Sequence, residues 1–147
     1  MTEFSVGMTS YGPLVTGFIG LFFAFILYGL IMRYPAGKSS VVKIGDQIHL
    51  GAKVFMFTEY KILAPVVLVL IIACGFSPLG WYTALAIGVG ALSSAIAGFI
   101  GMYSATKANV RTATAAENSG KEQALSISFF GGSIMGLCVA SMGLVGL

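Results

Sequence analysis

Long apolar stretches alternate with short polar segments along the whole chain. Four of these stretches are long enough to cross a bilayer, which takes about 20 consecutive apolar residues in a helix. They predict membrane-spanning helices over residues 11–32, 54–76, 81–104 and 124–147. The sequence "SPLG" at 77–80 is typical of a tight turn, so the second and third helices should form an antiparallel hairpin. The pattern predicts an all-α membrane fold, with residues 1–147 as a single transmembrane region.

The segment from Val41 to Lys61 has a different, amphipathic pattern. At helical spacing, one face carries Ile44, Ile48 and Phe55, and another carries Asp46, His49 and Lys53. This predicts a polar extension of the second helix, with Ser39 or Ser40 as its N-cap. Asp46 and His49 are too few to make a metal site. We therefore interpret them as part of a solvated polar face.

Small residues recur every four positions in the last two spans. They are Gly90, Ser94 and Gly98 in the third span, and Gly132 and Gly136 in the fourth. Small residues at this spacing let the backbones of membrane helices approach closely. The stripe predicts that both helices use these faces for packing, and it carries no chemistry of its own.

The composition shows where these helices lie. Charged residues make up only 9% of the chain, against about 25% in a typical soluble domain. Hydrophobic residues make up 57%, and the mean hydropathy is +0.95. Such a chain cannot form a water-facing surface, so we expect an integral membrane protein. Its net charge of +3 is attributed to membrane topology and not to nucleic-acid binding, for which the sequence has no motif.

The basic residues predict the orientation. All eight Lys and Arg residues lie within 33–61 and 105–123. The positive-inside rule places these two loops in the cytoplasm and the N-terminus outside. Glu59 lies about one turn before the uncharged part of the second span. It is either a residue at headgroup level or a buried partner for a charge on another helix.

The acidic residues restrict the possible functions. The chain has five Asp and Glu residues, and none lies within an uncharged apolar run. A transporter or a proteolipid-like ring subunit normally needs such an embedded carboxylate. The residues alone leave open a stand-alone four-helix small transporter, a membrane enzyme or a proteolipid-like subunit. No catalytic, cofactor-binding or metal-binding residue is assigned.

The stretch "GMYSATKANVRTATAAE" at 101–117 is small, polar and basic, and it follows the third apolar run directly. It predicts a cytoplasmic elbow between the third and fourth helices. Lys107 and Arg111 lie one turn apart, with Asn109 between them. The possible roles of Lys107 and Arg111 are anchoring to lipid phosphates, contact with helix ends of the same chain, and an assembly contact with further helices.

This stretch and the following "ALSISFFGGSIMGLCVASMGLVGL" resemble the third and fourth helices of the ion-translocating membrane pyrophosphatases. The matching positions are Gly101, Met102, Ala105, Thr106, Ala108, Asn109, Val110, Arg111, Thr112, Ala113, Ala115, Ala116, Gly131, Gly132, Met135, Gly136 and Leu137. Upstream, "GAKVFMFTEYKILA" looks like the start of the family's second helix. The resemblance runs in register over about residues 41–147.

The resemblance implies a pump of roughly sixteen helices per subunit, usually a homodimer. Such a pump hydrolyses Mg²⁺-bound pyrophosphate on the cytoplasmic side and moves H⁺ or Na⁺ outward. The catalytic helices form an inner ring, and the first four helices belong to an outer ring. For Arg111, the resemblance adds direct pyrophosphate binding as a further alternative.

One departure from the family decides what this chain is expected to do alone. The pyrophosphate motif Asp-x7-Lys-x-Glu is absent, and Asp46 does not supply it because Val54 stands where Lys is needed. We therefore expect an N-terminal scaffold fragment, covering helices one to four, that is inactive by itself. Its partners would be the remaining helices of the pump, which would also hold the Mg²⁺.

Overall fold

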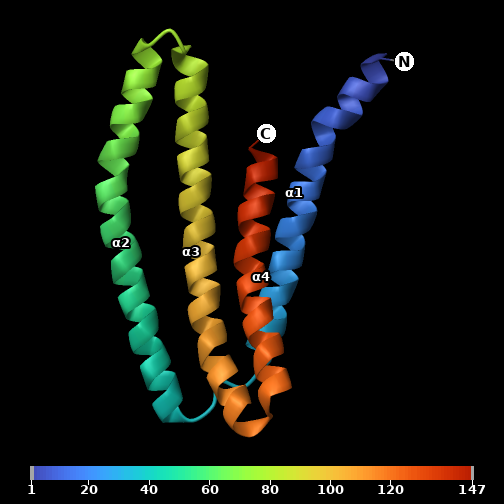
Figure 1. The fold of residues 1–147 in the computed structure, drawn as a ribbon, viewed down its shortest axis with the longest axis vertical. Helices are drawn as coiled ribbons and strands as arrows, with labels where there is room; N and C mark the ends of the chain where they lie inside the picture. The colour runs from blue at the N-terminus through green and yellow to red at the C-terminus, as the bar shows by residue number, and fades with distance from the viewer. Residues whose placement is uncertain (1, 147) are drawn as a thin grey trace.

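The computed structural model describes residues 2–146, with side chains from residue 11 onward, and these residues form four helices (Figure 1). The helices are α1 (Thr2–Met32), α2 (Ser39–Phe76), α3 (Gly80–Asn118) and α4 (Lys121–Val145). Each contains a stretch long and apolar enough to cross a membrane. The predicted all-α membrane fold with four spanning helices is confirmed.

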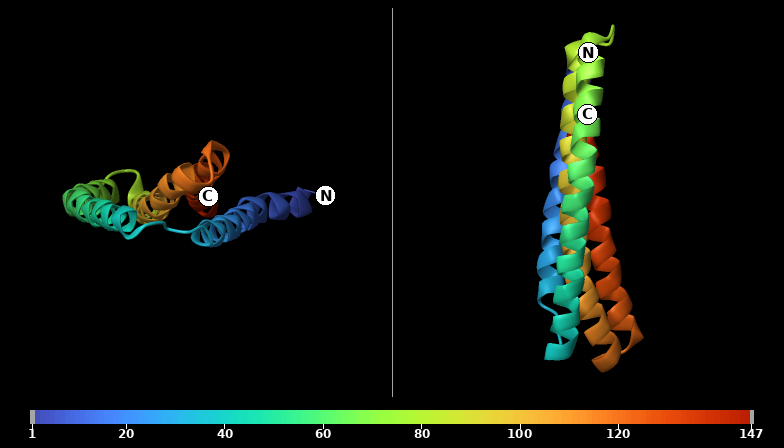
Figure 2. Two further views of the ribbon diagram at one scale, coloured as in Figure 1. Left: turned by 90° about the horizontal axis from the view of Figure 1, so that it is seen from below. Right: turned by 90° about the vertical axis from the view of Figure 1, so that its left-hand side faces the viewer.

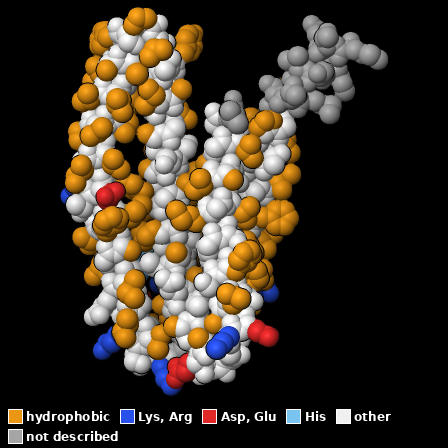
Figure 3. Space-filling view, viewed as in Figure 1, with side chains coloured by type: hydrophobic (Ala, Val, Ile, Leu, Met, Phe, Trp, Pro, Cys, Tyr) orange, Lys and Arg blue, Asp and Glu red, His pale blue; other side chains and the backbone are white. Residues whose placement is uncertain are grey.

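The helices extend well beyond the predicted spans. α2 and α3 have 38 and 39 residues, so each is about 57 Å long at about 1.5 Å per residue. The hydrocarbon core of a bilayer is only about 30 Å thick. Most charged side chains lie at one end of the bundle, where the helices extend beyond the apolar spans (Figure 3). We call this the charged end.

The two predicted basic loops are mostly helical. The non-helical connections in these segments are only residues 33–38 and 119–120. The predicted polar extension of the second helix is therefore present, and the cytoplasmic location of 33–61 and 105–123 stays a prediction. Hydropathy marks where contact with lipid stops, and it does not mark where a helix stops. The polar stretch after Ser104 is rich in Ala, the strongest helix former, so α3 continues to Asn118.

The prediction of a serine N-cap on α2 was also wrong. Lys38 is the N-cap residue, and no side chain caps this end. Gly37 has a φ of +85° and Lys38 an extended conformation, so the chain enters the helix at Ser39. The predicted turn at 77–80 is confirmed by the bond from Gly80 N to Ser77 O at 3.1 Å.

The helices stand in a row, in the order α2, α3, α4 and α1 (Figure 2). α3 packs against α2 on one side and α4 on the other, while α1 packs mainly on α4. Within the described residues, α1 and α2 make no helix–helix contact. Toward the end with the 77–80 turn, a gap of about 380 Å³ opens between α3 and α4.

Small residues let the helices approach closely at several points. A Cβ placed on Gly131 would lie 2.7 Å from Ala108 Cβ, and one on Gly101 would lie 2.6 Å from Met135 Cγ. Gly20 and Gly45 face Ser141 and Val110 in the same way. These glycines lie outside the predicted stripe, and they allow close contacts of α4 with α1 and α3 and of α2 with α3.

The predicted stripe mostly faces open space. Gly90, Gly132 and Gly136 have no atom within 4 Å of a Cβ built on them, and Gly90 and Ser94 line the gap between α3 and α4. Gly98 faces α2, where its Cβ would lie 3.3 Å from Tyr60 Oη. Within the described residues, Gly90, Gly132 and Gly136 thus meet no neighbouring helix, and their use in helix packing stays a prediction.

The amphipathic part of α2 packs against α3 through a face beside its apolar one. Ile44, Ile48 and Phe55 are all more than half exposed. Gly45 and His49 instead face α3, because a glycine admits Val110 and the histidine finds a polar partner there. Small size and hydrogen bonding decide this interface more than apolar burial does.

Candidate functional site

Arg111 joins two distant parts of the chain at the charged end. Its Nε donates to Tyr34 O at 3.1 Å, in the connection between α1 and α2. One terminal nitrogen donates to Lys107 O at 2.9 Å, on the preceding turn of α3. The residue is only 9% exposed. Arg111 therefore contacts a helix end of its own chain, one of the alternatives that the sequence left open.

Thr114 holds the same connection one turn further along α3. Its hydroxyl contacts two carbonyl oxygens, Ala36 O and Val110 O, each at 3.0 Å. Gly37 sits directly on this side chain, because a Cβ at Gly37 would collide with the Thr114 hydroxyl. Its φ of +85° also favours glycine. We call Arg111, Thr114 and residues 34–37 together the elbow clamp.

The chemistry of the elbow clamp is structural. Tyr34 lies just beyond the C-terminal end of α1, where carbonyl groups lack helical partners and the helix dipole is negative. A guanidinium satisfies such a carbonyl and offsets that partial charge. The neighbouring Ala115 is small and buried, so it leaves room for this contact. The clamp fixes the end of α1 against α3.

The three residues predicted at the elbow do not form one site. Lys107 points toward α2, where its Nζ lies 3.7 Å from Asp46 Oδ1. Asn109 is exposed and lines a shallow groove with Ile44 on α2. Arg111 turns toward the α1–α2 connection. A helix with 3.6 residues per turn separates positions two apart by about 200°, so Asn109 lies away from the other two. Lys107 and Arg111 share one face, and their side chains turn to different partners.

A polar contact between α2 and α3 was missed from the sequence. His49 Nδ1 lies 2.7 Å from Thr106 Oγ1, and that hydroxyl donates to Tyr103 O at 3.0 Å. Both bonds form together only when the histidine Nδ1 carries the proton and donates it. The His49 ring also meets the Tyr103 ring edge-on, with centroids 4.9 Å apart. His49 is half-buried, so its interpretation as part of a solvated face was wrong.

A second ionic link lies at the extreme charged end. Lys38 Nζ lies 2.5 Å from Glu117 Oε1, which joins the start of α2 to the end of α3. Glu117 raises the pKa of the Lys38 ammonium by hydrogen bonding and by its charge. Both side chains are exposed, so water and salt weaken the pair.

Glu59 lies away from these groups, on the exposed side of α2. Within the part of the chain that the structure describes, it forms no ion pair. Among the side chains that the structure describes, no group of three from His, Cys, Asp or Glu is placed to hold a metal ion. Mg²⁺ is typically held by about six oxygen ligands. The described residues therefore do not fit a Mg²⁺ site.

Comparison with known proteins places this arrangement in a family. A family profile described as "inorganic H+ pyrophosphatase" matches residues 18–147. The chain is 45% identical over 124 residues to a protein of Clostridium tetani provisionally named a K⁺-stimulated pyrophosphate-energized sodium pump. It is 38% identical over 130 residues to the K⁺-stimulated pyrophosphate-energized sodium pump of Thermotoga maritima. It is 35% identical over 147 residues to the K⁺-insensitive pyrophosphate-energized proton pump of Pyrobaculum aerophilum.

These alignments cover 84%, 88% and 95% of the chain, but only 18%, 18% and 20% of the respective relatives. The chain thus spans about a fifth of the length of the curated relatives it matches. The matched region includes all of α2, α3 and α4 and the whole elbow clamp. The chain is an integral membrane protein that belongs to the inorganic H⁺ pyrophosphatase family.

Proposed function

We propose that this chain forms the N-terminal, outer-ring membrane scaffold of a pyrophosphate-energised ion pump. Support comes from the family match over residues 18–147, which includes the structure's most specific tertiary contact, the elbow clamp. The clamp fixes α1 against α3, so the bundle presents a stable surface to other helices. In this proposal the pump moves H⁺ or Na⁺, the two ions named for its relatives.

The chemical step belongs to other parts of the pump. Binding pyrophosphate with Mg²⁺ needs several converging carboxylates and cations. Here Asp46 pairs with Lys107, Arg111 is used by the connection, and Lys38 pairs with Glu117. The chain alone should therefore be inactive, with Mg²⁺ and pyrophosphate bound by the remaining helices.

The open faces of the bundle support contacts with those helices. Gly132 and Gly136 face open space on α4, as Gly90 does on α3. Small residues on an open membrane face admit another helix closely. We propose that they receive helices of the remaining pump, which would complete a homodimer of larger subunits. Glu59, exposed on α2, is proposed to lie at headgroup level.

The proposed orientation places the charged end in the cytoplasm and the N-terminus outside. Single cysteines at Ser40 and Ser119, in a background without Cys74 and Cys138, should react only with reagents on the cytoplasmic side. A cysteine at Ser77 should react only from outside. Labelling of Ser77 and Ser119 from the same side would contradict this orientation.

Phosphate release from reconstituted vesicles tests the proposed function. The chain alone should release no phosphate from Mg-pyrophosphate above background. Co-reconstitution with the missing helices of a relative, such as the Thermotoga maritima pump, should restore hydrolysis and ion uptake. Hydrolysis by the chain alone would refute its scaffold role. Lack of restoration, despite co-purification of the two parts, would refute its role in the pump.

A further inference from the structure

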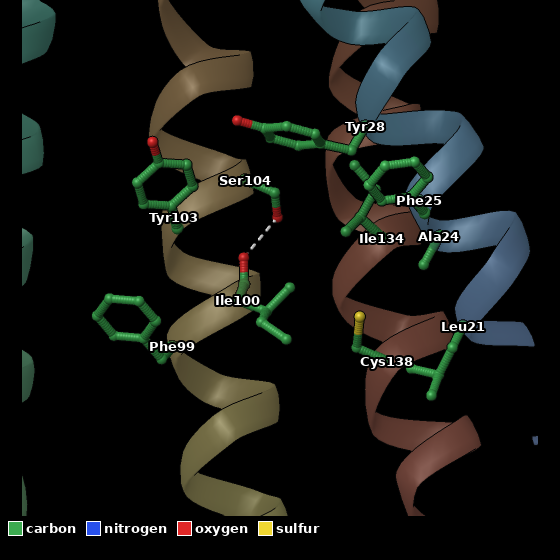
Figure 4. A pocket seen from close by; sticks show the side chains of 10 residues that line it. All are labelled: Leu21, Ala24, Phe25, Tyr28, Phe99, Ile100, Tyr103, Ser104, Ile134 and Cys138. Carbon is green, nitrogen blue, oxygen red and sulfur yellow. Dashed lines mark hydrogen bonds between the residues drawn. The ribbon is translucent and has the colours of Figure 1, made fainter. Parts of the chain in front are cut away.

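A second feature, separate from the elbow clamp, is a groove of about 430 Å³ between α1, α3 and α4 (Figure 4). Its lining includes Leu21, Phe25 and Tyr28 from α1 and Phe99, Tyr103 and Ser104 from α3, and α4 closes the third side. The Ser104 hydroxyl contacts Ile100 O at 2.9 Å and Gly101 O at 3.0 Å, within its own helix. The groove walls therefore offer hydrocarbon and almost no free polar group.

Two phenol groups mark one end of the groove. The Tyr28 ring reaches from α1 toward α3, and the Tyr103 hydroxyl points to the same end (Figure 4). Their ring centroids are 6.4 Å apart. Tyr28 lies one turn before the end of α1 at Met32, and Tyr103 lies at the end of the apolar run of α3. Tyrosines prefer the depth of the lipid headgroups, so this end lies at the membrane interface.

A cation lies on the same side of α3, one turn beyond Tyr103. The Lys107 side chain is 27% exposed, and its 3.7 Å separation from Asp46 makes a loose pair. Arg111, one turn further, is held by the α1–α2 connection. Of the two basic residues of α3, Lys107 is thus the one that the α1–α2 connection does not hold.

The length of the groove limits which molecule can bind in it. From Leu21 to Tyr28 the helix advances about 10 Å, at about 1.5 Å per residue. A helix that crosses the bilayer would need a continuous surface of about 30 Å. A groove confined to one leaflet, dry along its walls and polar at the interfacial end, matches a single lipid chain with its headgroup.

We propose that this groove binds one acyl chain of an anionic phospholipid, whose phosphate lies beside Tyr28, Tyr103 and Lys107. The lipid would fill the space between α1 and α3, which touch each other far less than either touches α4. It would then act as a wedge that sets the angle of α1. With the proposed orientation, the lipid comes from the cytoplasmic leaflet.

Fluorescence quenching by brominated lipids tests this proposal. Phe99→Trp places a reporter in the groove, in a Trp81→Phe background that removes the native tryptophan. The full chain is reconstituted into phosphatidylcholine vesicles that contain either brominated phosphatidylglycerol or brominated phosphatidylcholine. We expect the anionic lipid to occupy the groove about fivefold more strongly, the effect of about one Lys–lipid charge contact. Lys107→Gln should remove this preference, and Tyr28→Phe should reduce it.

The matched control is Phe57→Trp, because Phe57 is exposed on α2, outside the groove. Both lipids should quench this control equally after correction for their mole fractions. Equal quenching at the Phe99→Trp reporter, or a preference that survives Lys107→Gln, would refute the anionic headgroup site. Absence of quenching at Phe99→Trp while Phe57→Trp is quenched would show that protein fills the groove. Phe25→Trp supplies a second groove reporter, on α1, should the first variant fail to insert.

Discussion

Replacing Arg111 by Met removes the elbow clamp's charged donor and keeps most of the side-chain volume. The bond to Tyr34 O joins a charged donor to a neutral carbonyl, and such bonds contribute about 1.5–3 kcal/mol. The positive charge beside the end of α1 adds about 0.3–1 kcal/mol. The bond to Lys107 O lies within α3 and adds little to tertiary stability. Arg111→Met should therefore lower the free energy of unfolding by about 2–4 kcal/mol.

The assay is thermal unfolding in detergent, followed by a dye that becomes fluorescent when it reacts with a thiol. All proteins carry Cys74→Ala, because Cys74 is only partly buried. The remaining thiol, Cys138, is buried against α1 and α3, so it reacts only after the bundle opens. Arg111→Met should react at a clearly lower temperature than the wild type. Lys107→Met is the control, because its loose ion pair contributes only about 0–1 kcal/mol. Equal unfolding midpoints for the two variants would refute the clamp.

Two further predictions concern helix contact and charge. Gly131→Ala should lower the free energy of unfolding by about 1–3 kcal/mol, since the new Cβ would lie 2.7 Å from Ala108 Cβ. Gly132 faces open space, so Gly132→Ala is the control and should leave the stability unchanged. Equal thermal midpoints for the two variants would contradict this packing. Glu117 raises the pKa of Lys38. The contribution of this ion pair to the stability of the bundle is therefore complete below the ordinary lysine pKa of 10.5, and it disappears only as pH rises through the raised pKa. The difference in thermal midpoint between wild type and Lys38→Met should thus stay constant from about pH 6 to pH 9 and shrink above about pH 10.5. A difference that changes between pH 6 and pH 9 would refute the stabilising role of the Lys38–Glu117 pair.

The membrane spans could be predicted because lipid imposes a simple requirement. Any helix that crosses hydrocarbon must be apolar over its whole exposed length, and this leaves a signal in the sequence alone. The α2–α3 turn was predictable for a similar reason, since Ser77–Gly80 has the residues that tight turns require. Both are local properties.

The contacts between helices could not be predicted in the same way. Arg111 and Tyr34 are 77 residues apart, and no local pattern links them. The small-residue spacing of Gly132 and Gly136 was real, but neighbouring Gly131 faces α3 instead. In lipid, every face of a helix is apolar, so hydrophobicity does not show which face meets which neighbour.

The density of small and polar residues in 101–117 follows from the number of neighbours that α3 has at the charged end. Its Thr106 side meets α2, its Ala108 side meets α4, and its Arg111 side meets the α1–α2 connection. A helix with close neighbours on three sides has room for bulky residues only on the side that remains. Asn109 lies on a side that remains exposed.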